Sequence, residues 1–441
     1  ISACLVGSEM CIRDSTMIIK RPRGTYDIFG SELNLKDFLI KKMEESSKKY
    51  NFRRMITPIF EHKELFTRNI GETSDIVSKE IYDFKDKSNR DLALRPEGTI
   101  GVVRSIVENK LLHTNPLPLK YYYYGSMFRY ERPQSGRARE FNQFGIESIG
   151  IYSKYQVIEV IQLAMSFLKE LNLENFILKI NYIGCFETRL KWIDSLKEYF
   201  KKYENDLSND SKERINKNPL RILDDKIDGS KEFVKNAPSI SEFYNKEEIK
   251  SFDEFKTLFK KLKINFEHDS SLVRGLDYYS GLVFEVIGVL PNKSNTQTII
   301  GGGEYFHLTK ELGEKENWSC GFALGIERFY DFYLECNNNK FENDFIDFYL
   351  LPLTENALDY INENNLISNL RKEGYSIDIN YTFAKLDKQL KQSRKHNPKY
   401  LIIVGDDEIK NKTIKVKSQI TMKEEIINCH NFLNEISLIV N

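Results

Sequence analysis

The chain carries, at residues 124–141, the sequence YGSMFRYERPQSGRAREF, and this stretch decides the prediction of its fold. Aromatic-rich strands are predicted on either side, at 119–130 and 140–149, with a polar hairpin loop between them at 131–139. Four arginines and one glutamate lie between Met127 and Arg139. Arginines at a hairpin suit phosphate, because the planar guanidinium donates two hydrogen bonds to an oxyanion. On charge alone a solvated basic turn explains the segment equally well.

Length and composition set the limits around this hairpin. A chain of 441 residues suggests about three domains, and 29 Phe with 24 Tyr argue against disorder. No apolar run reaches the roughly 18 residues of a membrane span, so no membrane association is expected. Lys+Arg and Asp+Glu are equal at 65 each, which by itself argues against a polyanionic partner. That balance is an average over unlike regions, because residues 385–417 contain ten Lys+Arg and four Asp+Glu.

The cysteines and the first residues indicate the compartment. The chain has six Cys and no C-x-x-C pair, which argues against a zinc site and favours a reducing, cytoplasmic location. The sequence contains no His-x-x-x-His pair that would indicate a metal site, so we expect no dedicated metal ligands. The apolar run within residues 1–16 is too short for a signal peptide, and acidic residues interrupt it. We interpret them as a non-native leader before Met17, with a disordered natural tail as the alternative.

Hydrophobic periodicity predicts a mixed chain of helices and strands for residues 17–340. The expected elements are a helix from about 32 to 50 with Ser31 as its N-cap, an edge strand at 55–60, a helix at 155–171, a helical insertion at about 185–263, strands at 280–287 and 298–301 with a glycine run after them, and a strand plus helix at 319–334. The polar stretch 336–344 is a candidate linker.

Residues 341–441 have a rhythm of their own. The expected elements are strands at 345–352, 375–380, 400–404 and 413–416 and helices at 355–372, 386–396 and about 423–434. This alternation predicts a small α/β domain with a mixed sheet.

Two further segments carry polar residues next to strands. Residues 272–281 read LVRGLDYYSG, in which each tyrosine is either a core residue or a hydroxyl donor in a pocket. Residues 321–328 read GFALGIER, a strand that ends in glycine followed by Arg328 at a helix start. No Walker-type glycine loop and no G-x-G-x-x-G spacing occurs, so any ATP site is built on arginine.

Taken together, these segments resemble the histidyl-tRNA synthetase family of class II aminoacyl-tRNA synthetases. The match rests on RYERP at 129–133, RGLDYY at 274–279 and GIER at 325–328, with RGTYD at 23–27, TPIFE at 57–61 and LRPEGT at 94–99. It covers essentially 17–441. The resemblance implies an α+β fold: an antiparallel sheet flanked by helices, with the helical insertion, as a catalytic domain over 17–340, and a C-terminal α/β anticodon-binding domain over 341–441.

The resemblance also implies an activity and its residues. Histidine would be activated with ATP and Mg²⁺, the ion bound mainly through the phosphates, and then transferred to the 3′ end of tRNA(His). Arg129 and Arg274 would be catalytic at the α-phosphate. The ATP-binding residues would be Glu131, Arg137, Phe141 and Arg328, with Phe141 stacking on adenine and Glu131 at its side. The histidine-binding residues would be Glu97, Thr99, Arg129, Gln143, Glu147, Arg274, Tyr278 and Tyr279. Arg132 and Gln134 are candidates for reading the acceptor end of the tRNA, and the segment at Thr57 and Pro58 implies a homodimer.

Elementary chemistry supports this assignment. The amino group and imidazole of histidine are donors, so a pocket for them needs acceptors, which Glu97, Thr99, Gln143 and Glu147 supply, while Tyr278 and Tyr279 supply hydroxyls for the ring. Attack of a carboxylate on phosphorus builds negative charge, which preorganised arginines stabilise.

The sequence departs from the family pattern at two places. The usual Gly-Gly-Arg-Tyr-Asp run reads GGEYF at 302–306, which inverts a charge near the expected site. The usual Asp-Ala-Glu reads KYQ at 154–156, which we interpret as a structural change at a helix start.

Two rival functions share the fold. One is the catalytically inert paralogue that acts as a regulatory subunit of ATP phosphoribosyltransferase, and the other is a tRNA sensor domain. The retained Arg129, Arg274 and Arg328, and the C-terminal domain, favour the ligase.

Overall fold

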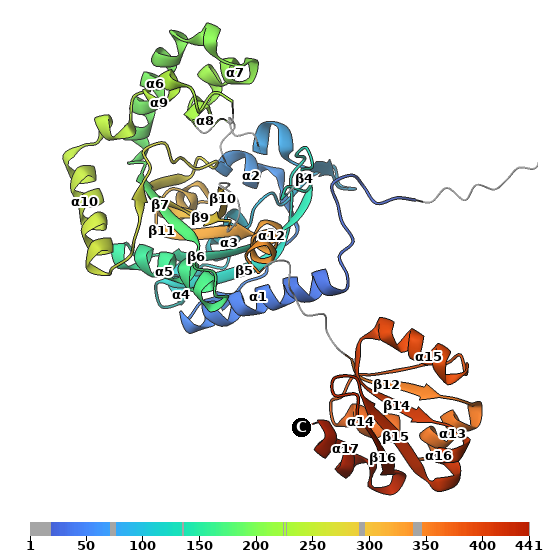
Figure 1. Ribbon diagram of the computed structural model, residues 1–441. Coiled ribbons are helices and arrows are strands. Elements are labelled where there is room, and N and C mark those ends of the chain that lie inside the picture. Colours follow the sequence, from blue (N-terminus) through green and yellow to red (C-terminus); the bar gives the residue numbers. More distant parts are fainter. Residues whose placement is uncertain are drawn as a thin grey trace, which may run out of the picture. The chain divides into compact units, whose positions relative to one another are not determined.

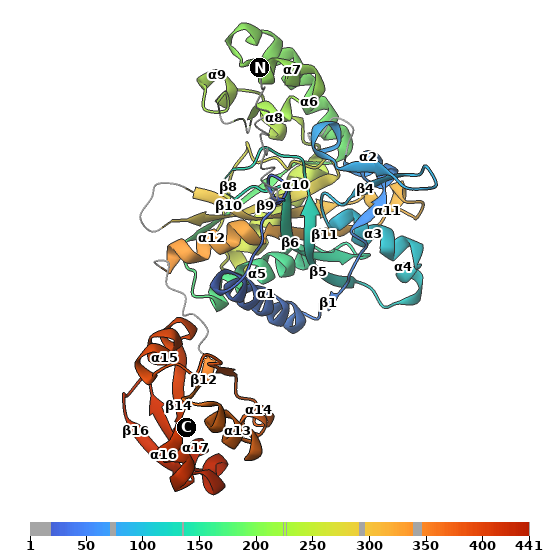
Figure 2. The same ribbon diagram turned by 90° about the vertical axis from the view of Figure 1, so that its right-hand side faces the viewer.

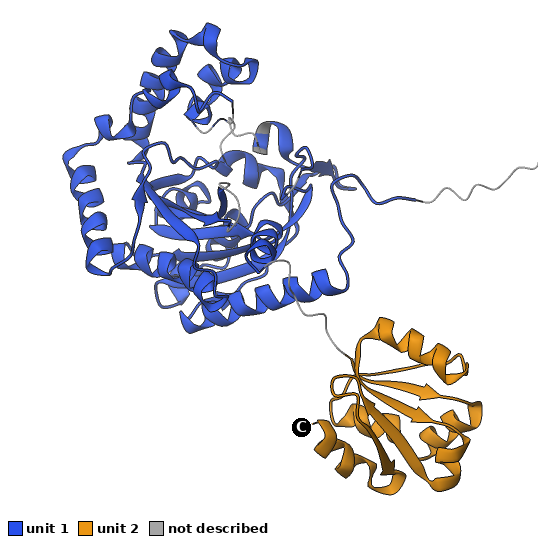
Figure 3. Cartoon of the chain, viewed as in Figure 1, with its two compact units in different colours: residues 1–340 blue, residues 341–441 orange. Residues whose placement is uncertain are grey.

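A computed structural model describes residues 19–70, 76–134, 136–223, 225, 227–290, 296–337 and 346–440. The chain divides into two compact units, residues 1–340 and 341–441 (Figure 3). The predicted leader at 1–16 and most of the candidate linker at 336–344 lie outside the described residues.

The first unit is built on a twisted sheet of eight strands within the described residues, in the order β1-β5-β6-β11-β10-β9-β7-β8. Its strands are β1 (Arg53–Arg54), β5 (Leu119–Phe128), β6 (Glu140–Ile149), β7 (Phe176–Tyr182), β8 (Glu267–His268), β9 (Tyr279–Val289), β10 (Thr296–Tyr305) and β11 (Ser319–Gly325). The six long strands run antiparallel to their neighbours, and the two short edge strands pair in parallel. The predicted hairpin is therefore the pair β5 and β6, and the prediction of an antiparallel sheet flanked by helices is confirmed.

Helices cover one face of this sheet through aromatic packing. The helices of the catalytic body are α1 (Ser31–Lys49), α2 (Lys63–Ile70), α3 (Thr99–Glu108), α4 (Leu111–Thr114), α5 (Lys154–Glu170), α11 (Leu308–Glu311) and α12 (Ile326–Cys336). Phe144 of β6 stacks on Tyr122 of β5, and its edge meets Phe167 of α5, which also contacts Phe322 of β11. α1 packs in turn on α5 (Figure 1). These buried rings leave the opposite face of the strands for other uses.

The segment predicted as a strand at 55–60 is not one. Only β2 (Phe60–His62) forms there, in a small sheet with β4 (Asp91–Leu94) and β3 (Asp83–Lys85). The Thr57 carbonyl instead accepts from Arg95 Nη1 at 2.9 Å, and the Arg95 backbone N–H donates to the Ile59 carbonyl. A buried guanidinium thus takes the place of the neighbouring strand, which residue propensity cannot anticipate.

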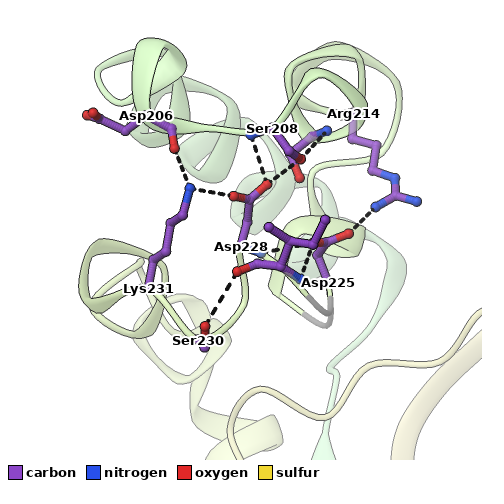
Figure 4. A network of polar contacts seen from close by, with 9 residues as sticks. Asp206, Ser208, Arg214, Asp225, Asp228, Ser230 and Lys231 are labelled. Atoms are coloured by element: carbon purple, nitrogen blue, oxygen red, sulfur yellow. Dashed lines mark hydrogen bonds and ion pairs between the residues drawn. The ribbon is translucent and has the colours of Figure 1, made fainter.

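The helical insertion comprises α6 (Phe186–Lys201), α7 (Asn209–Lys217), α8 (Leu220–Leu223), α9 (Glu232–Lys235) and α10 (Lys246–Lys261). Figure 1 and Figure 2 show α6 to α9 as a cluster that stands away from the sheet, on the side opposite α1. A polar network ties this cluster together around the buried Asp228, which accepts from the Ser208 hydroxyl and pairs with Lys231 (Figure 4). Burial alone would raise the pKa of Asp228, but these bonds hold it well below its usual range.

The second unit is the predicted α/β domain with a mixed sheet, in the order β13-β12-β14-β15-β16. Its elements are β12 (Ile346–Pro352), α13 (Glu355–Glu363), α14 (Leu366–Lys372), β13 (Ile377–Ile379), α15 (Leu386–Ser393), β14 (Pro398–Val404), α16 (Asp406–Asn411), β15 (Thr413–Ser418), β16 (Glu424–Asn428) and α17 (Phe432–Val440).

Two predictions for this unit are wrong in detail. The single helix at 355–372 is divided, because Asn365 adopts a left-handed backbone conformation between α13 and α14. The helix expected at 423–434 is the strand β16 followed by the start of α17. Pairing with β15, which joins Ile427 to Ile414 across the strands, outweighs the local pattern.

Two predictions for the first unit also need correction. Ser31 is not the N-cap of α1, because Gly30 occupies that position and Ser31 is the first helical residue. The glycine run 301–303 does not follow a strand but lies inside β10, which continues to Tyr305.

The substitution of Glu304 for the family arginine does not place a negative charge in the face of the sheet that carries Glu147. Glu304 pairs across the sheet with Cys320, one residue out of phase with Gly303 and Gly321, so its side chain lies on the other face. It is buried, and its carboxylate accepts from the Leu282 N–H at 2.6 Å and from Trp318 Nε1 at 2.9 Å. Burial raises the pKa of Glu304 to about 7. Glu304 of β10 therefore bonds β9 and the residue that precedes β11.

Candidate active site

The face of the sheet that α5 does not cover has a floor of glycine. Cross-strand pairing places one row of residues together on it: Tyr123, Gly145, Ala323, Gly301 and Glu285. A Cβ at Gly301 would lie 2.2 Å from Arg274 Nη2, and one at Gly321 would lie 2.1 Å from Glu147 Oε2. Glycine at these two positions therefore lets an arginine and a carboxylate lie directly on the backbone.

Glu97 is a buried carboxylate at the start of α3. Its two oxygens accept from the backbone N–H groups of Thr99, at 2.9 Å, and Ile100, at 2.7 Å. These are helix N-terminal donors that would otherwise be unsatisfied. Burial raises the pKa of Glu97, and these backbone bonds oppose the shift. The Tyr278 hydroxyl also donates to Oε2, at 3.5 Å, so Glu97 joins α3 to the segment before β9.

Glu147 of β6 is a second buried carboxyl, only 1% exposed. It accepts from the Tyr305 hydroxyl at 2.6 Å. Burial raises its pKa to about 8, although hydrogen bonds from Tyr305 and Thr99 work in the opposite direction. The negative charge of Glu97 raises it further. The two carboxyls thus form an acceptor-rich region.

A polar atom beside these carboxyls, the buried Gln143 Oε1, has no hydrogen-bond partner among the described residues. Gln143 and Glu147 each lie two residues from Gly145 on β6, so all three residues share the glycine-floored face. Buried polar atoms are nearly always paired, and Gln143 Oε1 is therefore placed to pair with a ligand.

Tyr278 and Tyr279 enclose this region. Both are buried, and their ring centroids are 4.7 Å apart. Tyr278 also meets Tyr305 edge to face, at 5.5 Å. Of the two alternatives for these tyrosines, core or pocket, the structure supports both at once, because their rings pack while the Tyr278 hydroxyl bonds Glu97.

Arg274 lies over the Tyr279 ring, with its guanidinium carbon 5.6 Å from the ring centroid. It pairs with Glu285 of β9, whose other oxygen accepts from the Thr298 hydroxyl at 2.8 Å. Burial lowers the pKa of Arg274, but Tyr279 and Glu285 more than reverse this shift, so the cation is retained. Its Nε has no partner in the described structure and is an available donor.

The β5–β6 hairpin brings further arginines together. Arg129 Nε donates to the Pro96 carbonyl at 2.9 Å, and its guanidinium lies 5.2 Å from the Phe141 ring centroid. Glu131 lies between two cations, 3.9 Å from Arg129 Nη1 and 3.2 Å from Arg137 Nη1. The hairpin therefore holds more positive than negative charge at its base.

Arg328, at the start of α12, adds to the same positive region. Its Nε donates to the Gly136 carbonyl of the hairpin loop at 3.3 Å. Burial lowers its pKa first, and the positive charges of Arg137 and Arg129 lower it further. A cation destabilised by neighbouring cations indicates a site that an anion would stabilise, which favours phosphate over a solvated turn.

The remaining predicted residues lie close by or at the rim. Thr99 is buried beside Glu97. Arg132 and Gln134 are exposed in the hairpin loop. Gln134 lines a cavity of about 600 Å³ together with Arg137 and with Asp27 of the N-terminal segment. These positions fit a surface contact better than a closed pocket.

Sequence reasoning missed some residues of the site. Tyr305 and Tyr123 stood in quoted or aromatic-rich segments without an assigned role, and Glu285 carried no motif. Arg95 stood in the LRPEGT motif, and it holds the segment at 57–59 to β5 through the Ser126 carbonyl at 2.8 Å. These contacts join residues that lie far apart in the sequence, so the structure is needed to reveal them.

Within the part of the chain that the structure describes, no group of three or more His, Cys, Asp or Glu side chains could hold a metal ion. No helix among the same residues is both long and apolar enough to span a membrane.

Comparison with known proteins agrees with this geometry. A family model described as histidyl-tRNA synthetase matches residues 24–329, and one described as an anticodon binding domain matches 347–438. The histidine–tRNA ligase of Malacoplasma penetrans is 53% identical and covers 95% of this chain and 98% of its own length. That of Geobacillus sp. (strain WCH70) is 41% identical, again over 95% of this chain and 98% of its own length.

A solved structure shows the same architecture. The crystal structure of apo S. aureus histidyl-tRNA synthetase is 32% identical, with a TM-score of 0.77, and the match covers 95% of this chain and 99% of that one. The resemblance inferred from the motifs is thus confirmed. Because the family model spans most of the chain and relatives match over nearly its whole length, the chain belongs to the histidyl-tRNA synthetase family.

Proposed function

We propose that this chain is a histidine–tRNA ligase. It joins the carboxylate of L-histidine to the α-phosphate of ATP, releases pyrophosphate, and transfers the histidyl group to the 3′ end of tRNA(His). One observation carries the assignment. A glycine-floored sheet face carries the acceptors Gln143 and Glu147 beside Glu97, and the β5–β6 hairpin holds more arginines than its single Glu131 can neutralise, which matches a cationic amino acid beside a polyphosphate.

The acceptor region suits histidine. Its ammonium group and imidazole N–H are donors, and Glu97, Gln143 and Glu147 can accept from them. The unpartnered Gln143 Oε1 supports this assignment, because a ligand without a donor there would leave it unsatisfied. Tyr278 and Tyr279 close the pocket around the ring, and Thr99 fixes the position of the Glu97 carboxylate through its N–H.

The arginines suit ATP. Arg129 would bind the α-phosphate and the histidine carboxylate, while Arg137 and Arg328 would hold the outer phosphates. Glu131 would accept from the adenine amino group. Phe141 would stack on the adenine with the ring face that Arg129 leaves open, since the guanidinium already covers the other.

Catalysis then follows from electrostatics and positioning. A carboxylate oxygen of histidine forms a bond to the α-phosphorus as the bond to the pyrophosphate oxygen breaks, and no proton needs to move. Arg274 and Arg129 would stabilise the charge that grows on the α-phosphate oxygens more than they stabilise the ground state. The unpartnered Arg274 Nε and the close seat of its guanidinium on Gly301 support this role for Arg274.

Family membership implies ATP use, and Mg²⁺ would accompany it. The ion prefers oxygen ligands and is usually held by phosphates with one or two carboxylates. Glu131 and Glu285 offer such carboxylates beside Arg137 and Arg274. Bound there, the ion would help neutralise the phosphate charge.

The tRNA would engage two regions of the chain. The second unit matches an anticodon-binding model and contains the basic stretch 385–417. Arg132 and Gln134, exposed in the hairpin loop, would contact the acceptor end. Cytoplasmic location is the expectation for such an enzyme, and four of the cysteines are free thiols, which suits a reducing compartment.

A homodimer is supported by an apolar patch next to Thr57 and Pro58. Ile56, Phe60 and Phe84 are 76%, 55% and 43% exposed, and the two phenylalanine rings lie 6.4 Å apart. Exposed apolar side chains gathered in one place favour a protein partner. We expect light scattering to give about twice the chain mass of 51.8 kDa. A mass equal to one chain at micromolar concentration would contradict this proposal.

The rival function is that of a regulatory subunit without catalysis. A Bacillus halodurans protein described as an ATP phosphoribosyltransferase regulatory subunit/histidyl-tRNA synthetase shares the fold at 20% identity. The retained Arg129, Arg274 and Arg328 favour the ligase.

Pyrophosphate exchange tests the function directly. Purified protein with ATP and labelled pyrophosphate should form labelled ATP when histidine is added, and not with other amino acids. Exchange requires adenylate formation and its reversal, so binding alone cannot produce it. Absence of histidine-dependent exchange in a folded sample that still binds tRNA would favour a sensor or regulatory protein.

Histidine binding should release a proton near pH 7. In the empty site Glu147 has a pKa of about 8, so it is protonated at neutral pH. A ligand ammonium beside it would favour the carboxylate and lower this pKa, which couples binding to proton loss. Histidine should therefore bind more tightly as the pH rises from 7 to 8.

Calorimetric titration in buffers of different ionisation enthalpy measures this release. Glu147→Gln, which cannot ionise, should bind histidine more weakly and release no proton in this range. Equal proton release by the wild type and the variant would show that another group is responsible.

A further inference from the structure

Arg189 of the helical insertion reaches into the catalytic body. It lies one turn into α6, and its two Nη atoms donate to the carbonyls of Tyr279, at 2.7 Å, and Asp277, at 2.6 Å. Burial lowers its pKa, and the negative charge of Asp277 opposes that shift. The guanidinium is thus a partly buried cation that donates to two backbone carbonyls.

These two carbonyls flank Tyr278. A rotation of the peptide groups between 277 and 279 would break at least one charge-assisted hydrogen bond, which is about twice as strong as a neutral one. The rings of Tyr278 and Tyr279 project from this stretch, and Arg274 lies over the Tyr279 ring. Arg189 therefore fixes the backbone that carries the proposed histidine-binding residues.

The start of helix α6, which carries Arg189, is itself held in place. The buried Glu248 of α10 accepts from the Cys185 N–H, at 2.7 Å, and from the Thr188 hydroxyl, at 2.8 Å, at the start of α6. Farther along the helix, Trp192 Nε1 donates to the Pro238 carbonyl at 2.7 Å. Helix α6 thus has fixed contacts on the insertion side, and a shift of α6 would be transmitted through Arg189.

A second arginine of the insertion approaches the same segment. Arg221 Nη2 lies 3.5 Å from the Gly275 carbonyl. A Cβ at position 275 would come within 2.5 Å of this nitrogen, so glycine there allows the close approach. Arg189 and Arg221 together contact three backbone carbonyls of the segment 275–279.

We propose that Arg189 is a positioning residue through which the helical insertion sets the affinity of the active site for histidine. The inference rests on the proposed function, because it concerns the same pocket. Arg189 does not contact the reacting atoms. It holds Tyr278 and Tyr279 in the orientation that encloses the histidine ring. Its loss should therefore affect the affinity for histidine more than that for ATP, since Arg129, Arg137 and Arg328 of the proposed ATP site lie on the hairpin and α12.

The test compares Arg189→Met and Arg189→Lys with the wild type in pyrophosphate exchange. Methionine retains much of the volume and removes the charge, so the KM for histidine should rise about 10- to 100-fold, as expected for a lost charge-assisted hydrogen bond. The KM for ATP should change by less than about threefold. Lysine, which can reach one carbonyl at a time, should give an intermediate value.

The matched control is Arg214→Met. Arg214 is an arginine of the same insertion, and it pairs with Asp225 at 2.7 Å in the network of Figure 4. This variant should leave both KM values unchanged, even if it lowers stability. Tryptophan fluorescence follows unfolding in each variant, because Trp192 and Trp318 both lie in the first unit.

The outcomes separate the two proposals. No histidine-dependent exchange by the wild type would overturn the proposed function itself. An active wild type whose Arg189→Met form has unchanged KM values, or an equal rise in both, would overturn the positioning role alone. If Arg189→Met does not fold, Arg189→Lys decides, since a selective rise in the KM for histidine supports the role and an unselective change overturns it.

Discussion

The active site depends on glycines at the centre of a sheet face that is otherwise lined by large and polar side chains. Antiparallel strands place alternate residues on opposite faces, and on the active face Gly301 and Gly303 of β10 and Gly321 and Ala323 of β11 are small. This leaves space for Arg274, which lies over Gly301, and for Glu147 of β6, which lies beside Gly321. The other face is packed by Phe144 and its aromatic neighbours against α5, which supports this arrangement.

The charges of the site are separated along this floor. Glu147 has a raised pKa and is protonated in the empty protein at neutral pH, while burial, together with the charges of Arg137 and Arg129, lowers the pKa of Arg328. A ligand ammonium would favour the ionised form of Glu147, and a polyphosphate would favour the charged form of Arg328. The two ends would therefore select for opposite charges, because a ligand of the wrong charge would stabilise neither.

Much of the fold could be predicted from the sequence. The aromatic-rich stretches and the polar segment between them predicted β5 and β6 closely, because their pattern is local. Features that depend on distant partners were not predictable in the same way. A guanidinium, that of Arg95, replaces a strand at 55–60, and pairing with β15 makes a strand of residues 424–428.

The site was less predictable than the fold. Motifs supplied the arginines and the carboxylates, but not their environment. The family pattern made Glu304 look like an inverted charge in the site, whereas strand alternation turns it to the other face, where it bonds Leu282 and Trp318. Arg189 lay in a region that reads as a separate helical insertion, and no sequence signal links it to the Tyr279 carbonyl.

The central claim is that catalysis requires the bare floor under Arg274, and Gly301→Ala tests it most directly. The added methyl would lie 2.2 Å from Arg274 Nη2, so the guanidinium must move. The measurement is the rate of histidine activation at saturating histidine and ATP, with urea unfolding followed by tryptophan fluorescence on the same samples. We predict a rate reduced by about 100-fold, as for loss of one preorganised donor to the transition state, with the unfolding midpoint nearly unchanged. An unchanged rate in the folded variant would contradict the account.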